Sequence, residues 1–553
     1  MRDSVRHIGR YVRTVRHLTP QQVVARVRLR VQRRLVGRFA KHFETRWTNA
    51  LAVTPIRLWP SSFVPLDARR FESRNAADRI VNRRFDLLNR EVEIGALDWH
   101  RSDVSQLWRF HLQYWDWAWH LVAHEEFSAI NDLWTEWSAQ CSYGRGDAWS
   151  PYVVSLRLWT LCGIHRFMLA GGADPVLLER ELRRHTGYLR ANLETDIRGN
   201  HLVKNLKALA GAAVFLGNLD LLDETLTALL AELDRQVLAD GGHYELTPSY
   251  HGQVLGDVLD VLGLLDETHH ERGLAELRAI ATAMRAWLAE FVGPDGTTPV
   301  LNDGYTLGPD ELEILGVSRT PEPRLVVLAE TGYVIARPTD TLQVIVDVGW
   351  PCPAELPGHA QADCLSFVVA DALGWVVVDT GCSEYGSSNR RAFERSTAAH
   401  NTVEVDRTNQ TEVWGAFRAG RRARPSLEKA TDDGITITVV GSHDGYRHLP
   451  GAVSHERSIR IVDRSIHVAD FLVGAGVHRV RSRLHLRPGW QLTDGSMSCI
   501  PASGQDSSIA ASSKVVVSSG SWSPAMGVLY PCDVLEQEYY GELPITLTWS
   551  IQL

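Results

Sequence analysis

The chain has 553 residues, of which 44% are hydrophobic and 22% charged, and its formal net charge is −8. This is the composition of an ordinary globular protein, and the length favours about two to four domains over a single core. The seven cysteines, an odd number without a CxxC pair, argue against a disulfide framework or a zinc ribbon. No apolar run approaches the ~18 to 20 residues of a membrane span, so no transmembrane segment is expected.

The first 46 residues are strongly basic, with 13 Lys and Arg against only Asp3 and Glu44. They contain no apolar stretch before a cleavage site, so we expect no signal peptide and a cytoplasmic location by default, with export by an unrecognised route as the alternative. A basic arm of this kind can dock on a membrane surface, on nucleic acid or on an acidic polysaccharide. It can equally be a solvated helix that lies on the acidic remainder of the chain.

Residues 50–105 carry Pro55, Pro60 and Pro65 and resemble a linker, and long helical patterns begin at Gln106. The predicted helices are Leu107 to Val122, Tyr152 to Leu169, Pro175 to Leu193, His201 to Leu216, Leu221 to Ala239, Pro248 to Thr268 and Glu271 to Val292. Short connections between them predict antiparallel hairpins.

Tryptophans are dense in this helical half, at positions 108, 115, 117, 119, 134, 137, 149 and 159. An indole can stack on the CH face of a sugar, so these residues, Trp149 among them, are candidates for binding a glycan. The alternative is that each tryptophan packs in the core between helices.

From about Arg324 the pattern changes to short, β-branched segments bounded by turns, which is typical of an antiparallel sandwich. The segment 358–406 contains a predicted hairpin, Leu365 to Ala370 and Trp375 to Val378, and a strand from Thr402 to Asp406. We therefore predict a basic arm and linker over 1–75, an (α/α) toroid of helical hairpins over 76–318 and an antiparallel β-sandwich over 319–553.

Two polar turns in the helical half are candidates for chemistry. In GNHLVKN, Asn200 and His201 open a helix, and Asn205 lies on the same face as His201. The donors of these side chains at a helix N-terminus suit a carboxylate. The alternative is that Asn200 is a helix N-cap. In DGGHYELTPSYH, Thr247 and Pro248 read as the N-cap and first residue of a helix, which places Tyr250 and His251 in its first turn. A tyrosine there can exchange protons if nearby cations lower its pKa.

The polar groups of 358–406 collect where predicted strands meet loops, a usual place for functional side chains. His359 and His400 flank the hairpin, with Asp363, Asp379 and Arg395 beside them.

Several stretches together resemble the heparinase II/III-like polysaccharide lyases: LWRFHLQYWDW, AWSPYVVSLRLW, GNHLVKNLKAL, DGGHYELTPSYH, PDGTTPVLNDG, GHAQADCLSFVVADALGWVVVDTG and RSTAAHNTVEVD. The resemblance implies a toroid followed by a β-sandwich, and an acidic polysaccharide rather than nucleic acid as the partner. It implies β-elimination at a uronic acid, in which the carboxylate is neutralised, the C5 proton is removed and the leaving O4 is protonated.

By position in these motifs, Asn200 and His201 resemble the carboxylate neutralisers. Tyr250 resembles the acid, which in some members is also the base, and His359 resembles the histidine that assists or acts as the base. His251 and Arg395 are further candidates for binding the acidic sugar, together with Asn205 and Trp149. The helical and sheet residues would then face each other over one groove.

Many relatives hold zinc in the sandwich, and the matching positions here are Gln361, Asp379 and His400. Gln361 stands where the family has a histidine, and a glutamine carbonyl suits calcium better than zinc. The elimination itself requires no cofactor. The three residues are therefore candidates for a structural divalent metal site, with a metal-free hydrogen-bonded cluster as the alternative.

Two other functions stay open. A glycoside hydrolase on a helical toroid needs two carboxylates about 5 to 10 Å apart, whereas the candidate turns are rich in His, Asn and Tyr. A glycan-binding or exopolysaccharide-assembly protein would keep the fold with little turnover.

Overall fold

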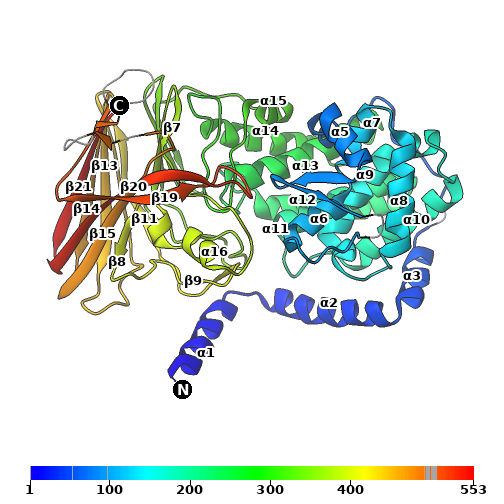
Figure 1. Cartoon of the computed structure of the whole chain (residues 1–553), viewed down its shortest axis with the longest axis horizontal. Helices are drawn as coiled ribbons and strands as arrows, with labels where there is room; N and C mark the ends of the chain where they lie inside the picture. The colour runs from blue at the N-terminus through cyan, green and yellow to red at the C-terminus, as the bar shows by residue number, and fades with distance from the viewer. Residues whose placement is uncertain (1, 53, 96–97, 491, 494–497, 500–506) are drawn as a thin grey trace. The chain divides into compact units, whose positions relative to one another are not determined.

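The computed structural model describes the whole chain except residues 1, 53, 96–97, 491, 494–497 and 500–506 (Figure 1). The chain forms two compact units, each described here by itself. The sheet unit consists of Met1–Leu18, Val237–Gly252 and Ala283–Leu553. The helical unit consists of Thr19–Gln236 and Gln253–Thr282.

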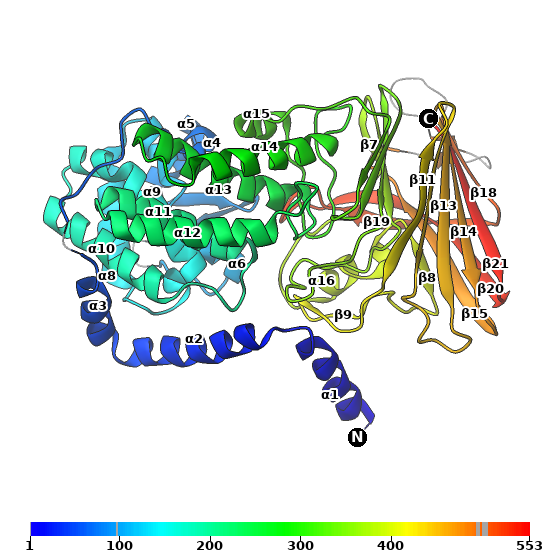
Figure 2. The same cartoon turned by 180° about the vertical axis from the view of Figure 1, so that it is seen from behind.

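The predicted fold class is confirmed, because a helical N-terminal region is followed by antiparallel sheets (Figures 1 and 2). The domain bounds remain a prediction. The helices are α1 (Arg2–Val15), α2 (Pro20–Arg38), α3 (Ala40–Asn49), α4 (Leu66–Arg70), α5 (Arg74–Val81), α6 (Gln106–Tyr114), α7 (Ala118–Ala123), α8 (Phe127–Gln140), α9 (Pro151–Ala170), α10 (Pro175–Ala191), α11 (Gly199–Phe215), α12 (Leu219–Gln236), α13 (Pro248–Glu267), α14 (Leu274–Glu290), α15 (Pro309–Leu315) and α16 (Asn389–Glu394).

Most helix ends lie within about three residues of their predicted positions, and α13 begins at Pro248 as expected. The predicted helix from Leu107 to Val122 is wrong in one respect, because it is two helices, α6 and α7. Trp115 separates them with a left-handed φ of 69°, a backbone conformation that no helix can continue through.

The tryptophans of the helical half pack in the core. Those at 108, 115, 117, 119, 134, 137, 149 and 159 are all buried, and Trp99 stacks on Trp115 with ring centroids 5.7 Å apart. A buried indole cannot stack on a polymer in solution. The interpretation of these residues as a floor for a glycan is therefore wrong, and the core alternative is correct.

Helix α9 is the one described helix that is long and apolar enough to cross a membrane, which the sequence analysis did not anticipate. Of its most apolar window, 67% is buried inside the structure. It packs in the helical unit against α6, α10 and α11. Length and composition alone are weak evidence for a membrane span, and a core helix passes the same test.

The strands form antiparallel sheets whose main members run in the order β3-β4-β5-β6-β7, β19-β20-β15-β8 and β11-β12-β13-β14-β21-β18-β17-β16. Their bounds are β1 (Arg84–Leu87), β2 (Arg90–Glu93), β3 (Leu325–Leu328), β4 (Tyr333–Thr339), β5 (Leu342–Asp347), β6 (Phe367–Asp371), β7 (Gly374–Val377), β8 (Val403–Val405), β9 (Val413–Trp414), β10 (Arg418–Ala419), β11 (Pro425–Asp432), β12 (Thr436–His443), β13 (Ser454–Val462), β14 (Ser465–Val473), β15 (Val477–His485), β16 (Leu492–Thr493), β17 (Ser498–Cys499), β18 (Ser507–Ala511), β19 (Val515–Trp522), β20 (Tyr530–Glu542) and β21 (Ile545–Gln552). The predicted hairpin is β6 and β7, and the predicted strand after it contains β8.

One apolar core lies between the sheets. It contains side chains of β5 and β6 such as Val344 and Phe367, together with Ile459 of β13, Val468 of β14 and Trp549 of β21. Strands β12, β13 and β14 alternate buried and less buried residues along their length. That period of two is the pattern of a sheet with one face against a core.

A buried polar network crosses this core. Arg457 donates to both carboxylate oxygens of Asp470, at 2.7 and 2.9 Å, and His455 lies 2.8 Å from the same carboxylate. Arg457 also donates to the Leu365 carbonyl at 2.7 Å, and so ties the segment before β6 to β13. Burial by itself would raise the pKa of Asp470, but Arg457 and His455 hold this pKa well below its usual range.

Replacing Asp470 with alanine is expected to destabilise the protein by about 3 to 5 kcal/mol, because Arg457 would be left buried without its counter-charge. Chemical denaturation measures the loss, with Glu456→Ala on the exposed face of the neighbouring strand β13 as the control. The ion pair contributes fully above the unfolded pKa of about 4 and is lost as pH falls towards the folded value. The difference between wild type and Asp470→Ala should therefore shrink in acid, and an undiminished difference would contradict the assignment.

Candidate active site

Tyr250 and His359, which are 109 positions apart in the sequence, meet in the sheet unit. Tyr250 lies in the first turn of α13, and His359 lies on the connection between β5 and β6. Their rings stack with centroids 4.2 Å apart and planes 29° apart. A phenol and an imidazole are thus side by side, and both can transfer protons near neutral pH in a suitable environment.

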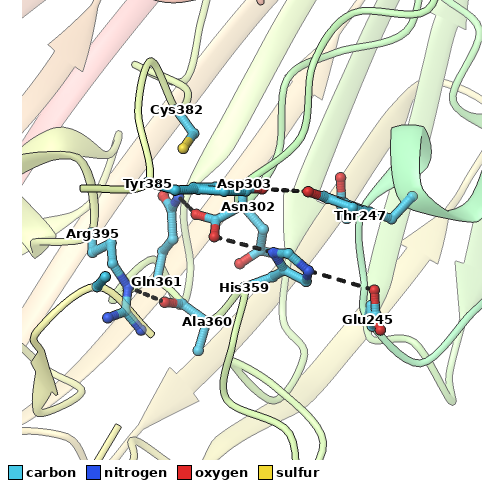
Figure 3. Close-up of polar contacts among 12 residues, drawn as sticks. Glu245, Thr247, Asn302, Asp303, His359, Ala360, Gln361, Cys382, Tyr385 and Arg395 are labelled. Carbon is cyan, nitrogen blue, oxygen red and sulfur yellow. Dashed lines mark hydrogen bonds and ion pairs between the residues drawn. The ribbon is translucent and has the colours of Figure 1, made fainter. Parts of the chain in front are cut away.

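His359 lies between two carboxylates (Figure 3). Its Nδ1 is 3.1 Å from Oδ2 of Asp303, and its Nε2 is 3.7 Å from Oε2 of Glu245. Asp303 is ionised, so it accepts the hydrogen bond and the Nδ1 atom carries the proton. The side chain of His359 is 16% exposed, which leaves part of the ring accessible. Asp303 therefore fixes both the orientation and the tautomer of the imidazole.

Asp303 is itself held by Arg391 of α16. The two guanidinium nitrogens donate to its two oxygens at 2.6 and 2.5 Å, and Gln361 adds a bond of 2.8 Å. Burial alone would raise the pKa of Asp303, but Arg391 and His359 hold it well below its usual range. A bidentate pair of this kind is geometrically specific, so the carboxylate has one position available.

The backbone at the site is strained at two residues. Leu246 and Asn302 have φ of 58° and 53°, in the left-handed region that side chains disfavour. Asn302 donates to the Leu246 carbonyl at 2.9 Å, and so does the Tyr333 hydroxyl at 2.7 Å. Gly304, two residues after Asn302, cannot be replaced by a residue with a side chain, because a Cβ there would collide with the Thr247 hydroxyl. Strain of this kind often marks a functional site. Here the two hydrogen bonds to the Leu246 carbonyl hold the strained turns that carry Glu245 and Asp303 in place.

Tyr385 is a site residue that the sequence analysis did not identify. It lies between β7 and α16, and its hydroxyl is hydrogen-bonded to the hydroxyl of Tyr250. Burial raises the pKa of Tyr250 well above its usual value, although the bond from Tyr385 opposes the shift. Tyr250 is therefore a neutral phenol, and nearby cations do not lower its pKa, which was the condition for it to exchange protons in both directions. A neutral phenol can act as the general acid that donates a proton.

Glu245, Asp303 and Tyr385 were all within reach of sequence reasoning. Glu245 and Asp303 stand in the motifs DGGHYELTPSYH and PDGTTPVLNDG, and Tyr385 follows the strand β7 in the polar segment GCSEYGSS. None of them was singled out, because an acidic residue or tyrosine in a turn is common. Only the tertiary structure brings them to one imidazole.

Asn200 and His201 lie in the helical unit. Helix α11 begins at Gly199 with Arg198 at the N-cap position, so the interpretation of Asn200 as the N-cap is wrong. Asn200 is buried, and the Nδ1 atom of His201 is 3.2 Å from Glu194, which orients its ring. The proposal that these two residues join Tyr250 and His359 at one sugar remains a prediction.

Four predicted binding residues are internal. The Nε2 atom of His251 bonds the Met284 carbonyl at 2.8 Å, and Arg395 donates to the carbonyls of Ala360 and Gly415 at 3.0 and 3.1 Å. Asn205 donates to Ser155 and Glu194, and the Trp149 indole donates to the Cys141 carbonyl. Burial lowers the pKa of His251 to about 3. These side chains support the loops and helices around them, and Figure 3 shows Arg395 directed at Ala360.

The candidate metal ligands do not form a zinc donor set in the described part of the chain. The Nδ1 atom of His400 is bonded directly to Oδ2 of Asp379 at 2.6 Å, and the amide of Gln361 is directed to Asp303. The described residues contain no group of three or more His, Cys, Asp or Glu side chains that could hold a metal ion. A structural zinc needs four ligands, and these three residues supply at most three, so the divalent metal site, zinc or calcium, stays a prediction.

Comparisons with known proteins agree with this fold. Residues 74–312 match the family model described as heparinase II/III N-terminus, and residues 320–529 match the one described as heparinase II/III-like, C-terminal. The chain therefore belongs to the heparinase II/III-like family.

Two solved structures share the fold at low identity. Heparinase III has a TM-score of 0.71 and 15% identity, covering 92% of this chain and 88% of that one. The heparan sulfate lyase from Pedobacter heparinus has a TM-score of 0.56 and 15% identity, covering 93% and 87%.

Two curated relatives match parts of the chain. The FtsZ-localized protein C of Caulobacter vibrioides is 28% identical over 252 residues, covering 43% of this chain and 42% of its own length. The heparin-sulfate lyase of Bacteroides thetaiotaomicron is 22% identical over 354 residues, covering 54% and 47%. The chain thus spans less than half the length of the curated relatives it matches.

Proposed function

We propose that this chain is a polysaccharide lyase that cleaves a uronate-containing glycan by β-elimination. The observation that carries the proposal is the stack of Tyr250 on His359, with the imidazole fixed by Asp303. Elimination needs one group to take a proton and another to give one at neighbouring atoms of the same sugar. An imidazole and a phenol whose ring centroids are 4.2 Å apart can both reach one sugar, which supports this requirement.

In the proposed reaction, Nε2 of His359 removes the C5 proton, and the electron pair forms the C4=C5 double bond. The C4–O4 bond breaks, and the neutral Tyr250 phenol gives its proton to the leaving O4. The products are an unsaturated uronate and a new chain end, and the enzyme holds an imidazolium beside a tyrosinate. Their proximity lets the proton pass back from His359 to Tyr250, which restores the starting state.

The C5 proton is a weak acid, so the uronate carboxylate must be neutralised as negative charge develops. Asn200 and His201 are the proposed donors. Replacing Asn200 with alanine is expected to lower kcat by about 10²- to 10³-fold with little change in KM, because the donor acts mainly on the transition state. Steady-state kinetics measure both. Asn200→Asp should be at least as damaging, because the new carboxylate would repel the carboxylate of the uronate. Wild-type turnover in either variant would remove Asn200 from the mechanism.

The activity itself is tested by incubating the protein with heparan sulfate, hyaluronan, chondroitin, alginate and bacterial exopolysaccharides. The new C4=C5 bond is conjugated with the carboxylate, so a lyase produces ultraviolet absorbance along with chain cleavage. Heparan sulfate is the first choice, because one curated relative is named a heparin-sulfate lyase. Cleavage without this absorbance would indicate a hydrolase.

Binding without cleavage would indicate a glycan-binding or assembly protein. The relative named for its localisation with FtsZ makes that outcome worth measuring, since its name states no enzymatic activity.

A further inference from the structure

Helix α2 exposes an aliphatic stripe that no described residue of the helical unit covers. Val24 and Val27 are 67% and 61% exposed, and Val31 is 50% exposed. The stripe consists of Val23, Val24, Val27, Val31 and Leu35. These positions recur every three to four residues, so they follow one face of the helix over about three turns. A continuous row of exposed aliphatic side chains is costly in water and indicates a partner.

The opposite face of α2 fixes the helix on its unit. Leu29 and Val36 are 0% and 1% exposed, and Gln32 donates to the Ala191 carbonyl at 2.6 Å and to Asn192 at 3.1 Å. Positions 29, 32 and 36 share one face of a helix, roughly opposite the stripe. Because the opposite face of α2 is buried and hydrogen-bonded, the stripe faces away from the helical unit.

Arginines lie beside the stripe and within it. Helix α2 contains no acidic residue, and Arg26, Arg28, Arg30, Arg34 and Arg38 are all exposed. Among the residues that the structure describes, none of these five arginines forms an ion pair within 4.0 Å. An arginine can extend its aliphatic stem along an apolar surface and keep the guanidinium at the polar boundary.

We propose that α2 binds in the plane of an anionic lipid surface, with the valine stripe among the acyl chains and the arginines at the headgroup phosphates. A face on which exposed aliphatic side chains alternate with arginines and are flanked by them matches this layered chemistry. An acidic polysaccharide offers no apolar layer for the valines, and a nucleic acid backbone offers none either. The proposal concerns a surface separate from the candidate active site and does not depend on the lyase activity.

Helix α1, in the sheet unit, shows the same division independently. Ile8, Val12 and Val15 are at least half exposed on one face. On the other face, Arg13 pairs with Glu412 at 2.6 and 2.8 Å, which ties the helix to its unit. Two successive N-terminal helices thus each have one face attached and one aliphatic face in solvent.

Co-sedimentation of the full-length protein with vesicles tests the proposal. We expect binding to phosphatidylcholine mixed with phosphatidylglycerol and little binding to phosphatidylcholine alone. The variant Val27→Gln with Val31→Gln should bind at least about tenfold less, because it removes the apolar centre without adding charge. The matched control is Val176→Gln with Leu177→Gln, which changes two residues of α10 that are 73% and 59% exposed. That control should bind like wild type.

Charge is tested separately. Arg26→Gln, Arg28→Gln and Arg30→Gln should each weaken binding to anionic vesicles by about fivefold, and added salt should do the same. Equal binding to neutral and anionic vesicles, or equal loss in the α10 control, would overturn the proposal. So would a wild-type dimer that the Val27 and Val31 variant dissociates in the absence of lipid, because the stripe would then join two copies of the chain.

Discussion

Elimination is expected to fall by about 10²- to 10⁴-fold when Tyr250 is replaced by phenylalanine, the range that general acid catalysis supplies. Phenylalanine keeps the ring that stacks on His359 at 4.2 Å and removes only the hydroxyl. Burial raises the pKa of Tyr250, so the phenol holds its proton through the neutral range and can donate it to O4. Initial rates on the polysaccharide that the wild type cleaves measure the loss of activity. Circular dichroism with thermal melting tests whether the variant is folded.

Tyr385→Phe is the matched control, because it removes the hydroxyl that is bonded to Tyr250 and leaves the acid in place. The loss of that bond raises the pKa of Tyr250 further, so a moderate decrease in rate is expected. If Tyr385→Phe were the more damaging change, Tyr385 would be the acid. Wild-type rates in Tyr250→Phe would remove Tyr250 from the mechanism.

Much of the fold could be predicted from local pattern. Helix α14 buries Leu277, Met284, Trp287 and Leu288 along one face, and strands β12 to β14 bury alternate residues. Burial of one face leaves a period of 3.6 or 2 in the sequence. The break at Trp115 could not be predicted, because nothing in WDWAWHL marks a left-handed residue. Its conformation is imposed by indoles that pack from elsewhere in the chain, such as Trp99 and Trp134.

The candidate site was only partly predictable. Tyr250 and His359 were identified from motifs, and the structure places their rings in contact. The roles given to His251 and Arg395 illustrate the limit of such reasoning: His251 follows Tyr250, and Arg395 stands in the polar segment 358–406. Their hydrogen bonds go to backbone carbonyls inside the protein, and no sequence pattern distinguishes a donor that faces a carbonyl from one that faces a ligand.

His359→Ala is expected to lower elimination by a similar 10²- to 10⁴-fold, because it removes the proposed base. The variant leaves Asp303 paired with Arg391, whose two bonds of 2.5 and 2.6 Å do not involve the imidazole. The fold should therefore survive, and thermal melting tests this. If the imidazole transfers a proton, added free imidazole should restore part of the rate; a purely structural role predicts no such rescue.

Asp303→Asn separates positioning from proton transfer in the same experiment. The amide oxygen can still accept the bond from Nδ1 of His359, but the negative charge that would stabilise an imidazolium after proton transfer is lost. The rate should therefore fall, and free imidazole should not restore it, because His359 still fills its place. A rate loss that accompanies a lower melting temperature would mean that Asp303 acts on the fold through Arg391 and not on the base.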